Sequence, residues 1–159
     1  MSRNARQQQL YEQRLAIEKS YQQLVVDYRA LGERIAPFVK DWPLTERPHS
    51  DAHHTDYEWF TDYFGNAFGQ IRFAIEHWKR STTSHSRFQH AVDDIAAGSD
   101  EFTRLYDRLA QDYETQPTHQ TALYEAMKNI HTLMVDTHTL INDINDYNAV
   151  VKNPRKLMR

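Results

Sequence analysis

Three histidines, His49, His53 and His54, lie close together in a stretch that also contains Asp51 and further carboxylates. Imidazole nitrogens and carboxylate oxygens are the ligands that zinc and similar metals prefer in proteins. A metal site on these histidines is therefore one prediction. The alternative is a solvated polar loop, because Pro48 disfavours the helix on which a four-residue spacing would bring two ligands to one ion.

Arg72 and His77 have four residues between them in the segment IRFAIEHW. This pair resembles the motif of HEPN-type ribonucleases, which are also small all-α bundles. The resemblance implies metal-independent RNA cleavage in the cleft of a dimer, with Arg72 holding the phosphate and His77 acting as general acid or base. The structural alternative is a flanking arginine and a histidine at the edge of the core.

Eight aromatic side chains lie between residues 57 and 78, more than one core-facing row of a helix can bury. Gly65 and Gly69 in the same stretch predict a smooth patch that another helix or a ligand could approach closely. Residues 70–90 also carry four basic side chains against one acidic side chain. The alternatives are a wide aromatic core and ordinary surface charge. The predicted contact surface consists of Trp42, Trp59, Tyr63, Phe73, Lys79, Arg80 and Arg87.

The five prolines divide the chain, because proline interrupts helices. The segments between them are predicted to be four helices, three long and the second shorter. The long connection 37–54 leaves the direction of the first helix open, whereas short links make the later neighbours antiparallel. The predicted helices span 3–36, 56–79, 86–115 and 118–151, and the third is expected to run unbroken through Gly98.

Apolar residues recur at seven-residue steps in each predicted helix, as in Leu10, Ile17, Leu24 and Leu31 of the first. A seven-residue step keeps side chains on one face of a helix. Four such faces can be buried only against one another, which predicts an all-α four-helix bundle. Tyr106 and Met134 are assigned to positions beside the core rows.

The 159 residues contain no cysteine and have a formal net charge of −3. Disulfide scaffolds and thiol enzymes are therefore excluded, and no apolar run approaches the length of a membrane span. We expect one domain over 1–159 with a basic tail at 152–159, a cytoplasmic location, no membrane partner and no cofactor. The first interpretation is a non-enzymatic bundle that binds another protein or itself. The ribonuclease, with RNA as partner, and the metal-binding bundle are the alternatives.

Overall fold

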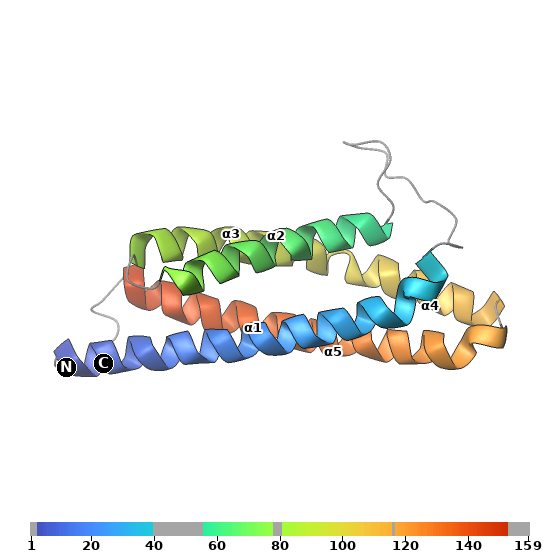
Figure 1. Cartoon of the computed structure of the whole chain (residues 1–159), viewed down its shortest axis with the longest axis horizontal. Coiled ribbons are helices and arrows are strands. Elements are labelled where there is room, and N and C mark those ends of the chain that lie inside the picture. The colour runs from blue at the N-terminus through green and yellow to red at the C-terminus, as the bar shows by residue number, and fades with distance from the viewer. Residues whose placement is uncertain (1–2, 40–55, 78–80, 116, 153–159) are drawn as a thin grey trace.

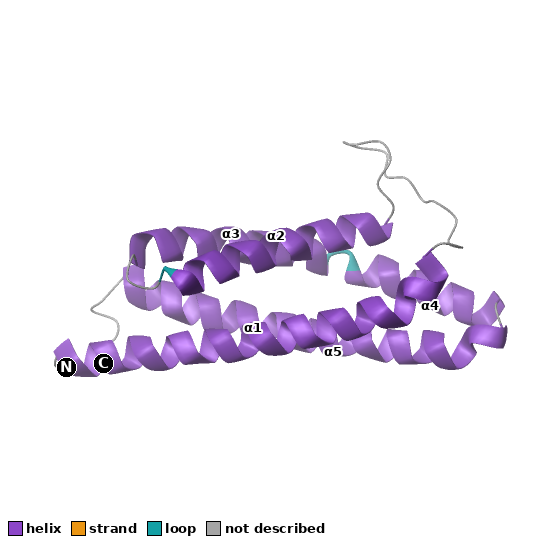
Figure 2. Ribbon diagram, viewed as in Figure 1, coloured by secondary structure: helices purple, strands orange, loops and turns teal. Residues whose placement is uncertain are grey.

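The structure, a computed structural model, describes residues 3–39, 56–77, 81–115 and 117–152, and within these ranges it is helical with no strand (Figure 2). The all-α prediction is confirmed. No described helix is both long and apolar enough to cross a membrane. The elements are α1 (Arg3–Val39), α2 (Asp56–Glu76), α3 (Ser81–Ser99), α4 (Phe102–Thr115), a 3-10 turn η1 (Pro117–His119) and α5 (Gln120–Lys152).

The helices form a four-rod bundle in which α3 and α4 together make one rod (Figure 1). The α1 helix lies along α5 and the α2 helix lies along α3, while both α3 and α4 also contact α5. Consecutive rods run in opposite directions, so α1 is antiparallel to α2 and also to α5 (Figure 1). This up-and-down order fixes the direction of the first helix, which the sequence left open.

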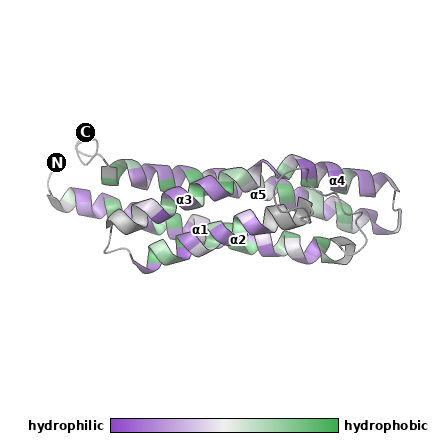
Figure 3. Cartoon of the chain, turned by 90° about the horizontal axis from the view of Figure 1, so that it is seen from above, coloured by the Kyte–Doolittle hydropathy of each residue, from purple (hydrophilic) through white to green (hydrophobic). Residues whose placement is uncertain are grey.

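The predicted apolar rows form the core. In α1, Ile17, Leu24 and Leu31 are fully or almost fully buried, and Leu10 packs at the edge of the same cluster. Hydrophobic and hydrophilic residues alternate around the helix axes in Figure 3, as expected for rods that bury one side. Each large apolar side chain transferred into such a core contributes about 1.5–3 kcal/mol relative to exposure. Fully buried rows of the other rods include Phe64, Ile71, Phe88, Ile95, Leu109, Leu123, Ile130 and Ile144.

The prediction of an unbroken third helix is wrong, because the rod breaks between α3 and α4. The Glu101 amide donates to the Gly98 carbonyl at 3.0 Å, which is a tighter turn than an α-helix allows. The Glu101 carbonyl then accepts from the Leu105 amide at 3.0 Å and starts α4. Ile95 and Phe102 are nevertheless both buried, so the apolar row keeps its phase across the break.

Two predicted helix ends are also wrong. The first helix was expected to stop before Pro37, but α1 continues to Val39, and the fixed φ of proline is compatible with this last helical turn. The second helix was expected to reach residue 79, but α2 ends at Glu76, where the His77 amide bonds the Ala74 carbonyl at 3.2 Å.

Two helix starts differ as well. The third helix begins at Ser81 rather than at residue 86, so the link before it is shorter than expected. The last helix begins at Gln120 rather than at 118, because the chain first makes the η1 turn after the α4 helix. It then ends at Lys152, one residue beyond the predicted end.

Candidate functional site

The structure brings together two residues of the predicted contact surface, Phe73 on α2 and Arg87 on α3. The Arg87 guanidinium carbon lies 4.4 Å from the centroid of the Phe73 ring, and Nη1 donates to Gln70 Oε1 at 2.9 Å. The His77 ring stacks on Phe73 with centroids 4.1 Å apart. All four side chains are half-buried. These contacts therefore tie α2 to α3, and they leave only part of each side chain available to a partner.

Arg72, one residue of the pair in the ribonuclease alternative, lies near the C-terminal end of α2, and His77 directly follows that end. Arg72 is exposed, whereas His77 is half-buried and its Nδ1 lies 2.8 Å from the Phe73 carbonyl oxygen. A carbonyl can only accept, so this bond places a proton on Nδ1. Five residues along a helix correspond to a rotation of about 140°, so the two side chains leave α2 in different directions. The catalytic role of the pair stays a prediction.

The metal prediction on His49, His53 and His54 lies outside the described residues, as do Trp42, Lys79 and Arg80 of the predicted contact surface. Trp59 lies in α2, but its side chain is not described. Among the side chains that are described, no group of three or more His, Asp or Glu residues could hold a metal ion.

Within the described chain a close approach occurs at Gly98, whereas Gly65 and Gly69 are open, so their approach by a partner helix or a ligand stays a prediction. A Cβ added at Gly65 or Gly69 would meet nothing within 4 Å. A Cβ added at Gly98 would lie 2.7 Å from Phe64 Cε2 and 3.1 Å from Tyr63 Cβ. Tyr63, predicted as a contact residue, is accordingly half-buried with its Cβ against α3.

A groove of about 440 Å³ between α4 and α5 contains Tyr106, which the sequence analysis placed beside a core row. Tyr106 and Met134 are 42% and 48% exposed, so their placement beside the core rows is corrected. Tyr124 and Val135 on α5 are 49% and 56% exposed. The residues that line the groove are Tyr106, Tyr124, Met127, Lys128, His131 and Thr132.

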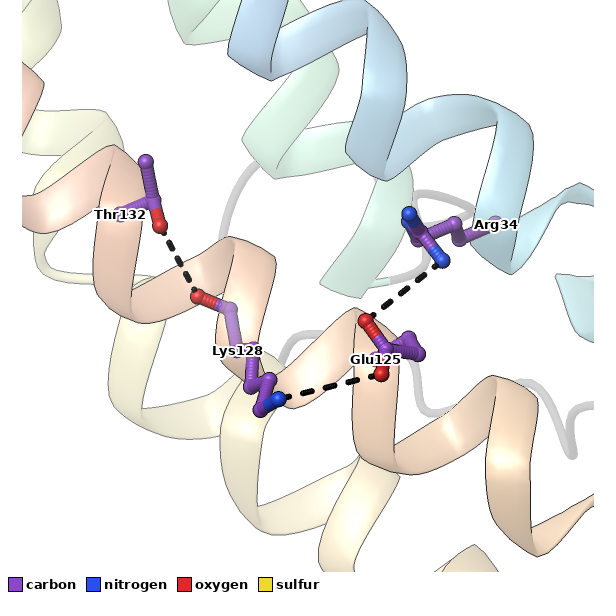
Figure 4. A network of polar contacts seen from close by, with 4 residues as sticks. All are labelled: Arg34, Glu125, Lys128 and Thr132. Atoms are coloured by element: carbon purple, nitrogen blue, oxygen red, sulfur yellow. Dashed lines mark hydrogen bonds and ion pairs between the residues drawn. The ribbon is translucent and has the colours of Figure 1, made fainter.

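Charged side chains border this groove on the side of α1 (Figure 4). Lys128 Nζ lies 4.8 Å from the centroid of the Tyr124 ring and 3.8 Å from Glu125 Oε1. Glu125 Oε2 in turn lies 3.9 Å from Arg34 Nη1, and Thr132 Oγ1 donates to the Lys128 carbonyl at 3.3 Å. The groove thus combines an aromatic and thioether floor with a cationic side chain at its rim.

One sequence signal could have revealed this groove. Beside its buried row, α5 carries a second row at alternating steps of three and four residues. Two heptad rows on one helix imply that the helix has two adjacent faces, each of which can pack against a different neighbouring helix. Its members are exposed or half-buried. They are Tyr124, Met127, His131, Met134, His138 and Ile141.

A second groove, of about 310 Å³, runs between α1 and α5, and most of the residues that line it are of polar type. Ser20 Oγ donates to Asp143 across it, and Gln23 Nε2 donates to Asp27 Oδ2 at 3.0 Å. Burial raises the pKa of Asp136 from 3.8 to about 7, aided by the hydrogen bond with Asp27 and by its charge. The residues that line the groove are Ala16, Lys19, Ser20, Gln23, Asp136, Thr139 and Asp143.

No protein-family model matches the chain, and neither the curated proteins nor the solved structures contain a match to it. The function therefore has to be inferred from the described surfaces themselves.

Proposed function

We propose that this chain acts by binding another protein, and that the groove between α4 and α5 receives an amphipathic helix of that partner. The observation that carries the proposal is the exposure of Tyr106 and Tyr124 in a groove of about 440 Å³, with Met134 and Val135 exposed further along α5. Neighbouring exposed apolar side chains around a concave surface are typical of protein interaction sites.

The chemistry of the groove favours a helix as the occupant. Tyr124, Met127 and His131 follow one another at steps of three and four residues, which is the spacing that a second helix matches with its own apolar row. Methionine side chains adapt their shape to different partners, and tyrosine gives a large contact area with little loss of conformational freedom. Lys128 at the rim favours an acidic residue beside the apolar row of the partner.

The α2 surface predicted from the sequence is the weaker candidate in its described part. Phe73 and Arg87 are half-buried and already contact each other, so a partner would gain little apolar area from them. The groove between α4 and α5 offers side chains that are about half exposed and that lie next to one another.

A matched pair of tyrosines tests the proposal. Tyr124 lines the groove, whereas Tyr11 is similarly exposed and lies at the opposite end of the bundle, because α1 and α5 are antiparallel. The photo-reactive residue p-benzoylphenylalanine replaces each in turn, and adducts formed in cells are identified by mass spectrometry. We expect a discrete adduct from position 124 and none from position 11.

Two further results make the test specific. The cross-linked partner peptide should carry apolar residues at steps of three and four, and Tyr106→Glu should lower the adduct yield by about tenfold or more. Equal adducts from both positions, no adduct, or a peptide without that spacing would overturn the proposal. An adduct between two copies of this chain would assign the groove to self-association instead, and sedimentation against concentration would then measure its strength.

A further inference from the structure

Polar residues of the α1/α5 interface form two facing pairs, Ser20 with Asp143 and Asp27 with Asp136, which we call rungs. Ser20 and Asp27 lie seven residues apart on α1, and Asp136 and Asp143 lie seven residues apart on α5. Because the helices are antiparallel, Ser20 meets Asp143 and Asp27 meets Asp136. Seven residues of helix correspond to about 10 Å, so the rungs lie two turns apart.

The hydrogen bond between Ser20 and Asp143 has the proton it needs when Asp143 is a carboxylate. A hydroxyl has one proton to donate and a carboxylate accepts it. Ser20 Oγ also lies 2.9 Å from the Ala16 carbonyl oxygen, which offers the same proton a second acceptor. This rung needs no additional proton.

The rung between Asp27 and Asp136 is different, because two carboxylates facing each other have no proton to donate. Gln23 Nε2 donates to Asp27 Oδ2 at 3.0 Å, so this oxygen of Asp27 already acts as an acceptor. Asp136 Oδ2 is buried and accepts no hydrogen bond. The proton of the rung therefore belongs on Asp136, which donates it to Asp27.

Apart from Asp136 itself, the charged side chains in the described lining of the groove are Lys19 on α1 and Asp143 on α5, and none comes from α2, α3 or α4. Lys19 lies eight residues before Asp27 along α1, which corresponds to about 12 Å. Further along the seam, Arg34 is already paired with Glu125. A second negative charge on this rung is therefore poorly compensated.

We propose that Asp27 and Asp136 form a proton-dependent clasp between α1 and α5, closed while the two groups share one proton and weakened when both are charged. This is a conformational property of the bundle and does not depend on the groove between α4 and α5. Loss of the proton places two negative charges across the helix interface and loosens α1, whose buried row is then opened to water.

The sign of the pH dependence follows from where the proton is lost. An unfolded chain releases the Asp136 proton near the ordinary pKa of 3.8, whereas the folded bundle releases it near a pKa of about 7. Between these values the folded state binds more protons, so the folding equilibrium falls as the pH rises and levels off above the folded pKa. From pH 5 to pH 8 the clasp should lower the equilibrium constant for folding at least about 10-fold and up to about 100-fold.

Urea unfolding of the whole chain at pH 5, 6, 7 and 8 measures this fall. The comparison is between variants, because a variant that differs at one residue keeps the other ionisable groups of the chain, including its nine histidines. In Asp136→Asn the amide donates to Asp27 at every pH. We therefore expect the decrease of the folding equilibrium constant that comes from the Asp27–Asp136 pair to disappear. Asp146→Asn removes an exposed carboxylate from the same helix and should keep the full fall of the unchanged chain. If Asp136→Asn does not fold, Asp27→Asn removes the hydrogen bond and the charge of the other partner, and it should flatten the profile in part because the burial of Asp136 remains.

The carboxyl carbon of Asp136, followed by NMR in the unchanged chain, gives a measurement that needs no variant. We expect its midpoint near pH 7, together with faster amide hydrogen exchange around Asp27 than in α2 and α3 at pH 8. A midpoint below about pH 5, or a pH profile of Asp136→Asn equal to that of the unchanged chain, would overturn the proposal.

Discussion

The two helix pairs of the bundle are held together in different ways. Between α2 and α3, the ring of Phe64 lies directly over Gly98 and is fully buried. Between α1 and α5, carboxyl, hydroxyl and amide groups face one another along the seam. Buried side-chain atoms without a hydrogen-bond partner occur on α1 and α5, as at Gln13 Oε1, but none occurs among the described side chains of α2 and α3.

The difference follows from the positions of the pairs in the chain. The α2 and α3 helices are joined by a few residues, so the short link by itself limits how they can pair, and close packing is sufficient. The α1 and α5 helices come from opposite ends of the chain and are 37 and 33 residues long. Long heptad rows can slide past each other by seven residues, and polar pairs within the seam specify one register at a cost in stability.

The largest effect is expected at Phe64, on the apolar side of the comparison. Its ring stacks on Tyr28 with centroids 5.4 Å apart and also contacts Phe68 and Phe102. Phe64→Ala should lower the free energy of unfolding by about 3–5 kcal/mol, because it leaves a cavity between four helices. Urea unfolding measures the loss, which should be the same at pH 5 and pH 8. A loss below about 1 kcal/mol would contradict the central packing role of Phe64.

Gly98 provides a smaller and more specific test of the same interface. Gly98→Ala places a methyl group 2.7 Å from the Phe64 ring. Overpacking costs about 1–3 kcal/mol and better helix propensity returns about 1 kcal/mol, so the net loss should be on the order of 1 kcal/mol.

The matched control is Gly65→Ala, where the added methyl group has open space. This control should gain about 0.5–1 kcal/mol from helix propensity alone. Equal effects of the two substitutions, measured by thermal unfolding, would mean that Phe64 moves aside without cost.

Thr137 on α5 tests the polar side of the comparison. Its side chain is only 3% exposed and its Oγ1 has no hydrogen-bond partner. Thr137→Val keeps the shape and removes the unpaired hydroxyl, so we expect the free energy of unfolding to rise by about 1 kcal/mol. Thr139→Val, at an exposed hydroxyl that donates to the Val135 carbonyl at 3.1 Å, is the control and should change it by less than about 0.5 kcal/mol. Clear destabilisation by Thr137→Val in urea unfolding would show that the hydroxyl has a partner in solution.

The smallest effect is expected at Glu125, which connects Arg34 and Lys128 at the surface of the α1/α5 seam (Figure 4). Both contacts are long, at 3.9 and 3.8 Å, and all three side chains are substantially exposed. Glu125→Gln should therefore change the free energy of unfolding by no more than about 0.5 kcal/mol, and added salt should remove the change. A change above about 1 kcal/mol that survives 0.5 M salt would mean that the contacts of Glu125, and not the half-buried pairs Ser20–Asp143 and Asp27–Asp136, fix the register.

Much of the fold could be predicted from local patterns. The seven-residue rows of Ile17, Leu24 and Leu31 and of their counterparts predicted four amphipathic rods, and each of these rows is buried in the structure. The break after Gly98 was missed, because the apolar phase runs through it unchanged from Ile95 to Phe102. The seven-residue spacing predicts which face of a helix is buried. It does not reveal a tight turn when the apolar residues on both sides of that turn stay on the same face.

The candidate surfaces were less accessible to sequence reasoning. Tyr106 and Met134 have the spacing of core residues, yet they are about half exposed, because burial depends on which neighbour lies opposite and how far it extends. The close packing at Gly98 was not predicted, since a glycine does not specify the residue that approaches it.

The order of hydrophobic and polar residues along the chain was by itself enough to predict the helices, the four rods of the bundle and the helix faces that are buried. These features depend on residues that lie within about two helical turns of one another in the sequence. Only the tertiary structure decided that Asp27 lies opposite Asp136 and that Ser20 lies opposite Asp143. Such pairs join the two ends of the chain, and their chemistry depends on direction, register and burial, which exist only once the helices have assembled.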